Sequence, residues 1–182
     1  MKQIRKNIIY TIGHSTNSID KFLEILTSFN IKILVDIRRF PGSKKYPWFN
    51  REPLEAALKE KDIQYIHLEA LGGRRKVLPD SKNDKWHNSS FRGYADYMET
   101  PAFETAVTQL ENIAIKQPTV YMCAEAVWWR CHRAMVSDYL KAKGWTVLHI
   151  MASNKTEEHP YTPVARVIND QVFYYDENLF NH

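Results

Sequence analysis

The segment from Cys123 to Arg133 brings together side chains that could do chemistry. It contains Cys123, Glu125, Arg130, Cys131, His132 and Arg133. An apolar stretch typical of a buried strand precedes it, and helical spacing follows it. If the helix begins near Arg130, its free backbone N–H groups and its dipole favour an anion at that end. The arginines add fixed positive charge and the histidine a charge that depends on pH, so the segment predicts an anion-binding loop.

The two thiols of this segment have more than one interpretation. Positive charge at a helix N-terminus would lower the pKa of a thiol and make it a better nucleophile. Cys123 and Cys131 are therefore candidate catalytic residues, and Glu125 and His132 are candidates for proton transfer. Cysteine is also among the most buried residue types, so Cys123 could serve packing alone. Inert packing, a reactive thiol and a redox pair of both cysteines stay open as alternatives.

The sequence predicts no metal centre and identifies no cofactor. The spacing of Cys123, Cys131 and His132 matches no common zinc pattern. The sequence contains no Gly-x-Gly-x-x-Gly, no Walker A and no Gly-x-Ser-x-Gly motif. These absences disfavour a dinucleotide-dependent enzyme, a P-loop NTPase and an α/β-hydrolase.

Other polar residues follow the ends of other predicted strands. His14 comes directly after Gly13, and it could bond its own turn or act as an acid or base. Asp36 and Arg38 lie two residues apart on an extended stretch, so they share one face. They could pair with each other or orient a ligand. We therefore add His14 to the catalytic candidates, and Asp36 and Arg38 to the candidates for binding the anion.

Two basic stretches carry further arginines. The first contains Arg38, Arg39, Lys44 and Lys45 beside the aromatic residues Tyr46, Trp48 and Phe49. The second begins with Arg74, Arg75 and Lys76. Basic residues among aromatic ones suit phosphate contact with base stacking, but they suit a solvated loop equally well. Arg39 and Arg74 become anion-binding candidates, and nucleic acid stays an alternative partner to a small anionic molecule.

The predicted elements would carry these groups to one place. Strands are expected at residues 7–14, 31–38, 63–68, 118–123 and 145–151, with helices from 19 to 29, near 51–61, at 94–115 with a break at 100–101, and at 131–143. This alternation predicts an α/β fold, with a mostly parallel five-stranded sheet and helices on both faces in a Rossmann-like three-layer arrangement. Ligands of such sheets bind outside the carboxyl ends of the strands, where the candidate residues lie.

Length and composition are those of one globular domain. The chain has 182 residues and a formal net charge of +4, which is too small to imply nucleic acid. We expect a single domain over 1–182 with its core at about 7–151, and a C-terminal extension at 152–182 that contains a β-hairpin at 164–175. The long segment 72–92 lacks periodicity. No stretch is long and apolar enough to cross a membrane, and we expect a cytoplasmic protein.

The chain resembles the Domain of Unknown Function 488 family of mainly prokaryotic proteins. The matching pieces are Thr11-Ile12-Gly13-His14-Ser15, Val35-Asp36-Ile37-Arg38-Arg39-Phe40-Pro41 with Ser43 and Phe49-Asn50, Leu71-Gly72-Gly73, Phe91-Arg92-Gly93-Tyr94-Ala95-Asp96-Tyr97-Met98, Cys123-Ala124-Glu125 and Arg130-Cys131-His132-Arg133. They occur in this order and span about residues 8–151. The chain departs from similar proteins at Val127-Trp128-Trp129, where those usually carry charged residues or proline.

The resemblance implies an α/β fold and no established activity. The positions that it marks as motif residues are His14, Asp36, Arg38, Glu125, Arg130, Cys131, His132 and Arg133. Arg92, which lies in one of the matching pieces, is a further candidate for binding the anion. By analogy alone, rhodanese-like domains also place an Asp-x-Arg at one strand end and a cysteine before an anion-binding loop. We expect an uncharacterised small enzyme or ligand-binding protein with an anion or phosphate pocket. The alternatives are a nucleic-acid-binding module and a regulatory domain without catalysis.

Overall fold

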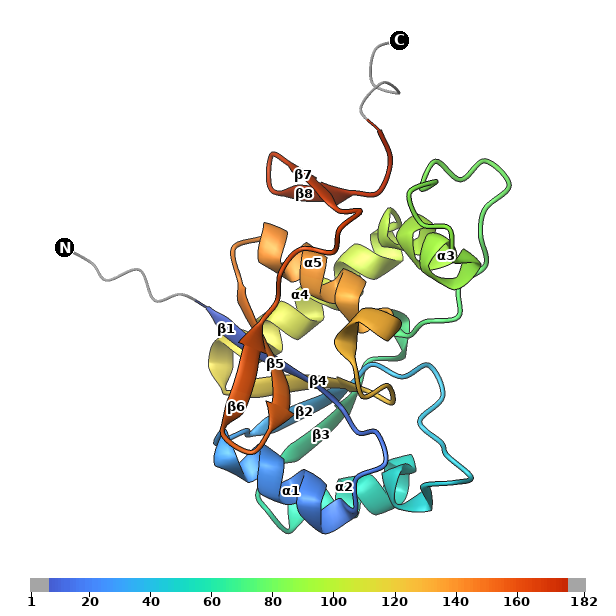
Figure 1. Cartoon of the computed structure of the whole chain (residues 1–182). Helices are drawn as coiled ribbons and strands as arrows, with labels where there is room; N and C mark the ends of the chain where they lie inside the picture. Colours follow the sequence, from blue (N-terminus) through green and yellow to red (C-terminus); the bar gives the residue numbers. More distant parts are fainter. Residues whose placement is uncertain (1–6, 177–182) are drawn as a thin grey trace, which may run out of the picture.

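The computed structural model describes residues 7–176 and contains a six-stranded sheet, in which runs rich in apolar residues form all strands but the last (Figure 1). The strands are β1 (Ile8–Gly13), β2 (Ile33–Asp36), β3 (Gln64–His67), β4 (Thr119–Cys123), β5 (Thr146–Ala152) and β6 (Lys155–Glu158). Their order is β3-β2-β4-β1-β5-β6, and the first five pair in parallel. The prediction of a mostly parallel sheet is confirmed.

The sixth strand was not expected from the sequence. β6 pairs antiparallel with β5 after a tight turn, in which Asn154 has a φ of 57°. All four residues of β6 are exposed and three of them are charged, so they show no apolar alternation. β6 covers the edge of the sheet with polar side chains, as edge strands in soluble proteins often do.

Five α-helices connect the strands within residues 7–176. They are α1 (Ile19–Ser28), α2 (Arg51–Lys59), α3 (Ser89–Met98), α4 (Pro101–Lys116) and α5 (Arg133–Ala142). The side chain of Ser18 accepts a hydrogen bond from the backbone of Lys21, which caps α1. The expected break lies between α3 and α4, where the Thr100 side chain caps the second helix and Pro101 occupies its first turn.

The helices cover both faces of the sheet. Figure 1 shows α1 and α2 below the sheet, with α4 and α5 above it. Leu34 and Met122 pack with Phe22 and Leu54 on the α1–α2 side. On the opposite face the core includes residues from the alternate strand positions and from α4 and α5, among them Ile9, Val35, Tyr121, Val147, Leu110 and Met135. The three-layer α/β arrangement is therefore confirmed.

The loop that follows β4 crosses the carboxyl end of β1. The backbone of His14 donates to Cys123 O at 3.0 Å, and Ser15 donates to Ala124 O at 2.9 Å. A Cβ atom at Gly13 would lie only 1.6 Å from the carbonyl oxygen of Glu125. Glycine at this position therefore lets the loop lie directly against the end of the neighbouring strand.

A buried carboxylate holds the long segment between β3 and α3. Asp96, on α3, accepts hydrogen bonds from Leu78 N at 2.9 Å, Ser81 Oγ at 2.6 Å and Asn83 Nδ2 at 2.8 Å. Arg92 donates to the side chain and the carbonyl of Ser81, at 3.0 and 2.7 Å. The anion-binding candidate Arg92 thus holds this loop in place and does not line the pocket described below.

The C-terminal segment forms the predicted hairpin and also reaches the core. β7 (Arg166–Ile168) and β8 (Gln171–Phe173) pair antiparallel around Asn169 and Asp170, whose φ angles are 49° and 60°. Such positive φ values are typical of a tight hairpin turn. The next residue, Tyr174, is buried in the core between the helices. In the part of the chain that the structure describes, no helix is long and apolar enough to cross a bilayer.

Candidate functional site

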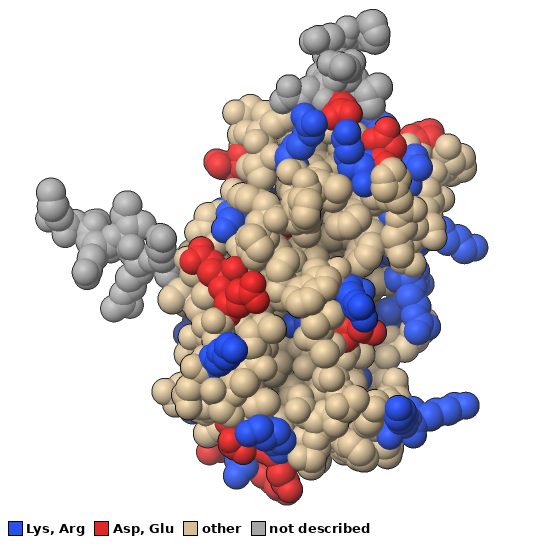
Figure 2. Space-filling view, viewed as in Figure 1, with Lys and Arg blue, Asp and Glu red and all other residues tan. Residues whose placement is uncertain are grey.

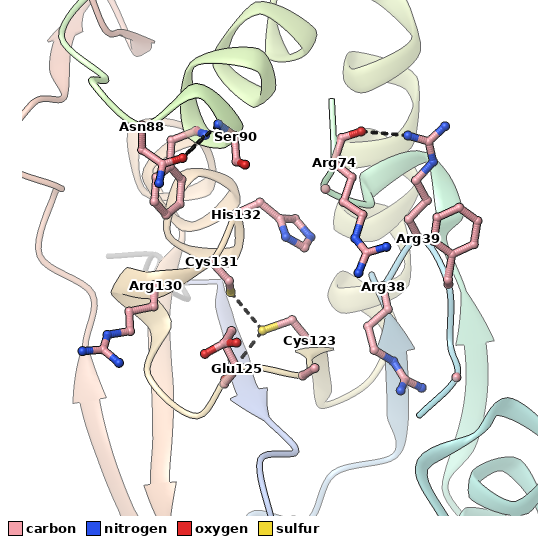
Figure 3. Close-up of a pocket in the computed structure, with 15 residues that line it drawn as sticks. Arg38, Arg39, Arg74, Asn88, Ser90, Cys123, Glu125, Arg130, Cys131 and His132 are labelled. Atoms are coloured by element: carbon pink, nitrogen blue, oxygen red, sulfur yellow. Dashed lines mark hydrogen bonds between the residues drawn. The ribbon is translucent and has the colours of Figure 1, made fainter. Parts of the chain in front are cut away.

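A pocket of about 410 Å³ opens at the carboxyl edge of the sheet (Figure 3). It lies beyond the ends of β2 and β4 and is bordered by the start of α3. Eight of the twelve candidate residues line it: Arg38, Arg39, Arg74, Cys123, Glu125, Arg130, Cys131 and His132. The other four candidates, His14, Asp36, Arg92 and Arg133, lie outside the lining. The topology therefore brings groups from three distant parts of the sequence together.

The two thiols face each other at the bottom of this pocket. Cys123 ends β4, and Cys131 follows a 3₁₀ turn at Trp128–Arg130. Their sulfur atoms are 2.9 Å apart, and both cysteines are free. The α-helix begins at Arg133, three residues later than the position near Arg130 expected from the sequence, because the 3₁₀ turn and an extended Cys131 come first.

This later start places Cys131 directly at the helix N-terminus. The backbone N–H of Arg133 donates to Cys131 Sγ at 3.4 Å. Burial alone would raise the pKa of the Cys131 thiol. The opposing effects are larger and lower that pKa to about 7: Cys123 donates a hydrogen bond, and Arg133 contributes its charge and further hydrogen bonds. The thiolate form of Cys131 is therefore favoured relative to that of a free cysteine.

Cys123 has the opposite character. Burial raises the pKa of its thiol well above the ordinary value, and the neighbouring Cys131 raises it further. Its side chain is only 2% exposed, whereas Cys131 is half-buried on the pocket wall. The S–H group of Cys123 therefore donates to the Cys131 thiolate. The pair consists of one accessible nucleophile and one protonated thiol behind it.

Arg133 lies beneath the loop that carries these thiols. It is 1% exposed, and its guanidinium donates to Thr11 Oγ1 at 3.1 Å, Glu125 O at 3.0 Å and Ala126 O at 3.3 Å. All three acceptors are neutral oxygens, and its Nε has no hydrogen-bond partner among the described residues. Arg133 therefore fixes the loop over β1, and the Cys131 thiolate supplies a negative charge beside it.

A buried chain of hydrogen bonds continues from Arg133 into the molecule. Because arginine only donates, Thr11 accepts from it and donates its hydroxyl proton to His149 Nδ1 at 2.7 Å. His149 Nε2 then donates to His159 Nδ1 at 2.8 Å, and His159 Nε2 donates to Asp138 Oδ1 at 2.8 Å. Burial lowers the pKa of His149 to about 2, so this ring stays neutral.

Asp138 completes that chain as a saturated carboxylate. Besides the bond from His159, Asp138 accepts from the backbone N–H of Thr162 at 2.9 Å, from the Thr162 hydroxyl at 2.6 Å and from Tyr174 Oη at 2.8 Å.

The indole of Trp128 stacks on His149 at a centroid distance of 4.7 Å and an angle of 3°. Trp128 is thus buried against the histidines, whereas Trp129 is 52% exposed.

Asp36 and Arg38 pair with each other, which was one of the two expected arrangements. Arg38 donates to both carboxylate oxygens of Asp36, at 2.9 and 2.7 Å. Tyr65 Oη also donates to Asp36 at 2.7 Å, so this buried carboxylate is satisfied inside the protein. Asp36 therefore orients Arg38, and Arg38 contributes to the pocket wall.

The histidines His14 and His132 are both neutral near pH 7. Burial lowers the pKa of each to about 4, and nearby arginines contribute in the same direction. His14 Nδ1 donates to Ser15 O at 2.9 Å, so it bonds its own turn. His132 Nε2 donates to Ile37 O at 3.2 Å, which leaves Nδ1 as an unprotonated acceptor. Of the two, only His132 lines the pocket.

Arginines form the rim of the pocket with one carboxylate, that of Glu125. Arg39 donates to Arg74 O at 2.9 Å, and both guanidinium groups lie against the exposed ring of Phe40. In Figure 3 the side chain of Arg74 points toward the middle of the pocket, whereas that of Arg130 points away from it. Lys and Arg side chains also gather along the right-hand edge of Figure 2, over the loops that follow β2 and β3.

Several of these residues were missed by the sequence reasoning. Asn88, Ser90 and Phe91 line the pocket from the start of α3. The chain of Thr11, His149, His159 and Asp138 lies behind it. A signal for His149 was available, because a histidine inside a buried strand needs a hydrogen-bond partner. Among residues 7–176, no group of three or more His, Cys, Asp or Glu side chains is arranged to hold a metal ion.

The fold and the site define the protein as an α/β domain with a pair of thiols in an arginine-lined pocket. The chain matches the family described as "Domain of unknown function DUF488" over residues 18–140. Because this match covers more than half of the chain, the protein belongs to that family, and the resemblance seen in the sequence is confirmed. No curated protein and no solved structure matches the chain.

Proposed function

We propose that the protein is a thiol-dependent enzyme that acts on a small anionic substrate, with Cys131 as its nucleophile. The observation that carries this proposal is the position of Cys131 on the wall of an arginine-lined pocket, where its sulfur accepts from the backbone N–H of Arg133 at the start of α5. This position lowers the pKa of the thiol to about 7. Thiolates are the reactive form of cysteine, and helix N-termini and arginines are the usual means of stabilising them.

The remaining lining residues support defined roles. Arg74, with Arg38 and Arg39 beside it, would hold the negative group of the substrate, because guanidinium groups bind carboxylates and phosphates well. The unprotonated Nδ1 of His132 could accept a proton, and Glu125 offers a second group for proton transfer. The volume of about 410 Å³ suits a molecule of metabolite size.

Alkylation with a matched pair of reagents tests this proposal. Iodoacetate is anionic and iodoacetamide is neutral, and both transfer a similar group to a thiolate. Cys131 should react with a pH midpoint near 7 rather than near 8.5, the value of a free cysteine. Iodoacetate should be favoured over iodoacetamide by about tenfold relative to a small thiol at low salt. Cys131→Ser should abolish the fast reaction.

A charge-matched pair of variants tests the role of the pocket. Arg74→Gln should slow the reaction with iodoacetate about threefold to tenfold and leave that with iodoacetamide nearly unchanged. Lys116→Gln removes the same charge at the end of α4. This residue lies just before the start of β4, whereas the pocket lies beyond the other end of that strand, so the variant should change neither rate. A midpoint near 8.5, or equal effects of the two variants, would refute the proposal.

The nucleic-acid-binding alternative stays a prediction. Phe40, which is 61% exposed between Arg39 and Arg74, could stack on a base, but the same arrangement fits a small anion equally well.

A further inference from the structure

We propose that Cys123 and Cys131 act together as a dithiol that reduces a disulfide substrate carrying an anionic group. Cys131 attacks the substrate and Cys123 resolves the product of that attack. This inference rests on the proposed function, because it assigns the substrate class and the second step to the same pocket.

The geometry separates the tasks of the two sulfurs. Cys131 borders the pocket and can meet a substrate, whereas Cys123 lies behind it with 2% exposure. The side chain of Cys123 contacts Cys131 Sγ at 2.9 Å and Glu125 O at 3.7 Å. A disulfide bond is about 2.05 Å long, so less than 1 Å of further approach would join the two sulfurs. Cys123 is therefore placed to attack a group bound to Cys131.

The reaction has two steps. The Cys131 thiolate attacks one sulfur of the substrate, the substrate disulfide breaks, and one substrate thiolate leaves and takes a proton from solvent. Cys123 then loses its proton and attacks Cys131 Sγ. The mixed disulfide breaks, the second substrate thiolate leaves, and a Cys123–Cys131 disulfide remains. The substrate gains two electrons and becomes two thiols. A second, reducing thiol compound must restore the protein dithiol before the next turnover.

The electrostatics change in favour of the second step once the first has occurred. Burial raises the pKa of Cys123, and hydrogen bonding and repulsion from Cys131 raise it further, while Arg133 lowers it. In the mixed disulfide Cys131 no longer carries a negative charge, so its contribution disappears. The positive charge of Arg133 remains beneath the loop. Cys123 therefore loses its proton more readily at the stage where it must attack.

A single equivalent of an anionic aromatic disulfide tests the inference. The probe is 5,5′-dithiobis(2-nitrobenzoate), whose released thiolate is coloured, and intact mass reports the state of the protein. The wild type should release both thiolates of the probe and lose two hydrogens in mass. Cys123→Ser, or Cys123→Ala if the serine variant does not fold, should release one thiolate and keep the other as an adduct. Cys131→Ser should react at least tenfold more slowly than wild type.

The outcomes separate this inference from the proposed function. An adduct that persists on Cys131 in the wild type, with no internal disulfide, overturns the dithiol step, and a Cys131 alkylation midpoint near 7 would then still support the proposed function. If Cys131 reacts slowly with the probe and with both alkylating reagents, both proposals fail. The neutral disulfide 4,4′-dithiodipyridine measures the anion preference once the rate of each probe is divided by its rate with a small free thiol. A normalised rate with the neutral probe that equals or exceeds that with the anionic one overturns the anionic part of the substrate class.

Discussion

Arg133 is a buried cation whose guanidinium donates to three neutral oxygens, and the thiol of Cys131 lies beside it. Three carbonyl and hydroxyl oxygens accept from its guanidinium, and none of them belongs to a carboxylate. A buried charge without an opposite charge is costly. The thiolate form of Cys131 reduces that cost, so the charge of Arg133 and the low pKa of Cys131 depend on each other.

The hydrogen bond between the sulfurs gives a prediction at the scale of single atoms. Cys123→Ser keeps a donor beside Cys131, whereas Cys123→Ala removes it. The pKa of Cys131 should stay near 7 in the serine variant and rise to about 8–9 in the alanine variant, because a hydrogen bond to a charged group is worth about 1.5–3 kcal/mol. The pH dependence of iodoacetamide alkylation measures both values. Identical midpoints in the two variants would show that the bond does not matter.

Residue types in the sequence identified the pocket but not the direction of each side chain. Cys131 and His132 could be predicted as lining residues because they follow a strand exit. Arg133 could not be separated from Arg130, since the short 3₁₀ turn moves the helix start by three residues and thereby buries Arg133. The partners of His149 were equally hidden. Thr11 lies 138 residues away in the sequence, and His159 follows the exposed strand β6, which no apolar pattern indicates.

At the scale of elements, the site depends on the contact between the loop after β4 and the end of β1. The loop residues Ala124 and Glu125 are held by backbone bonds from Ser15 and by Arg133. Gly13 makes this contact possible because a side chain there would overlap the Glu125 carbonyl. The loop in turn places Cys131 at the start of α5, so a disturbance at β1 should reach the thiols.

Gly13→Ala tests this coupling. The added methyl group should displace the loop, lower the free energy of unfolding by roughly 2–4 kcal/mol and slow the alkylation of Cys131. Gly42→Ala is the matched control for stability, since its added Cβ would come no closer than 3.9 Å to a neighbouring atom. Urea denaturation measures both variants. A Gly13 variant as stable as the Gly42 variant would contradict the close contact.

The predicted elements agree with the structure where packing produces periodicity and differ where it does not. The five parallel strands and their helices have buried faces, which the apolar spacing revealed. β6 has no buried face, and only its pairing with β5 makes it a strand. The C-terminal segment was expected outside the core, but Tyr174 and His159 enter it through bonds to Asp138 that no local pattern indicates.

At the scale of the whole molecule, burial keeps several histidines neutral. The pKa values of His14 and His132 are lowered to about 4 and that of His149 to about 2, chiefly by burial. In the unfolded chain these histidines would titrate near 6.5. Below that pH the unfolded state binds more protons than the folded state. The folded state therefore keeps its full stability above about pH 6.5 and loses it as the pH falls toward 4.

The free energy of unfolding should fall between pH 7 and pH 5 by about 1–2 kcal/mol for each of these histidines. Urea denaturation at both pH values measures the loss. His132→Gln removes one titrating group and keeps a side-chain donor for Ile37 O. Between pH 7 and pH 5, the free energy of unfolding of this variant should therefore fall by about 1–2 kcal/mol less than that of the wild type. A variant with the same pH dependence as the wild type would exclude His132 as a contributor.

The strand order has a consequence for synthesis and folding. β4 lies between β1 and β2, although both of those strands precede it by more than eighty residues. During synthesis β1 and β2 are therefore made before the strand that lies between them. The edges with which they pair to β4 have no partner until β4 has been synthesised. Pairings this distant in sequence close slowly. The thiol pair is thus assembled only after β4 has paired with its neighbours, and until then both cysteines are exposed to any oxidant or foreign thiol that the nascent chain meets.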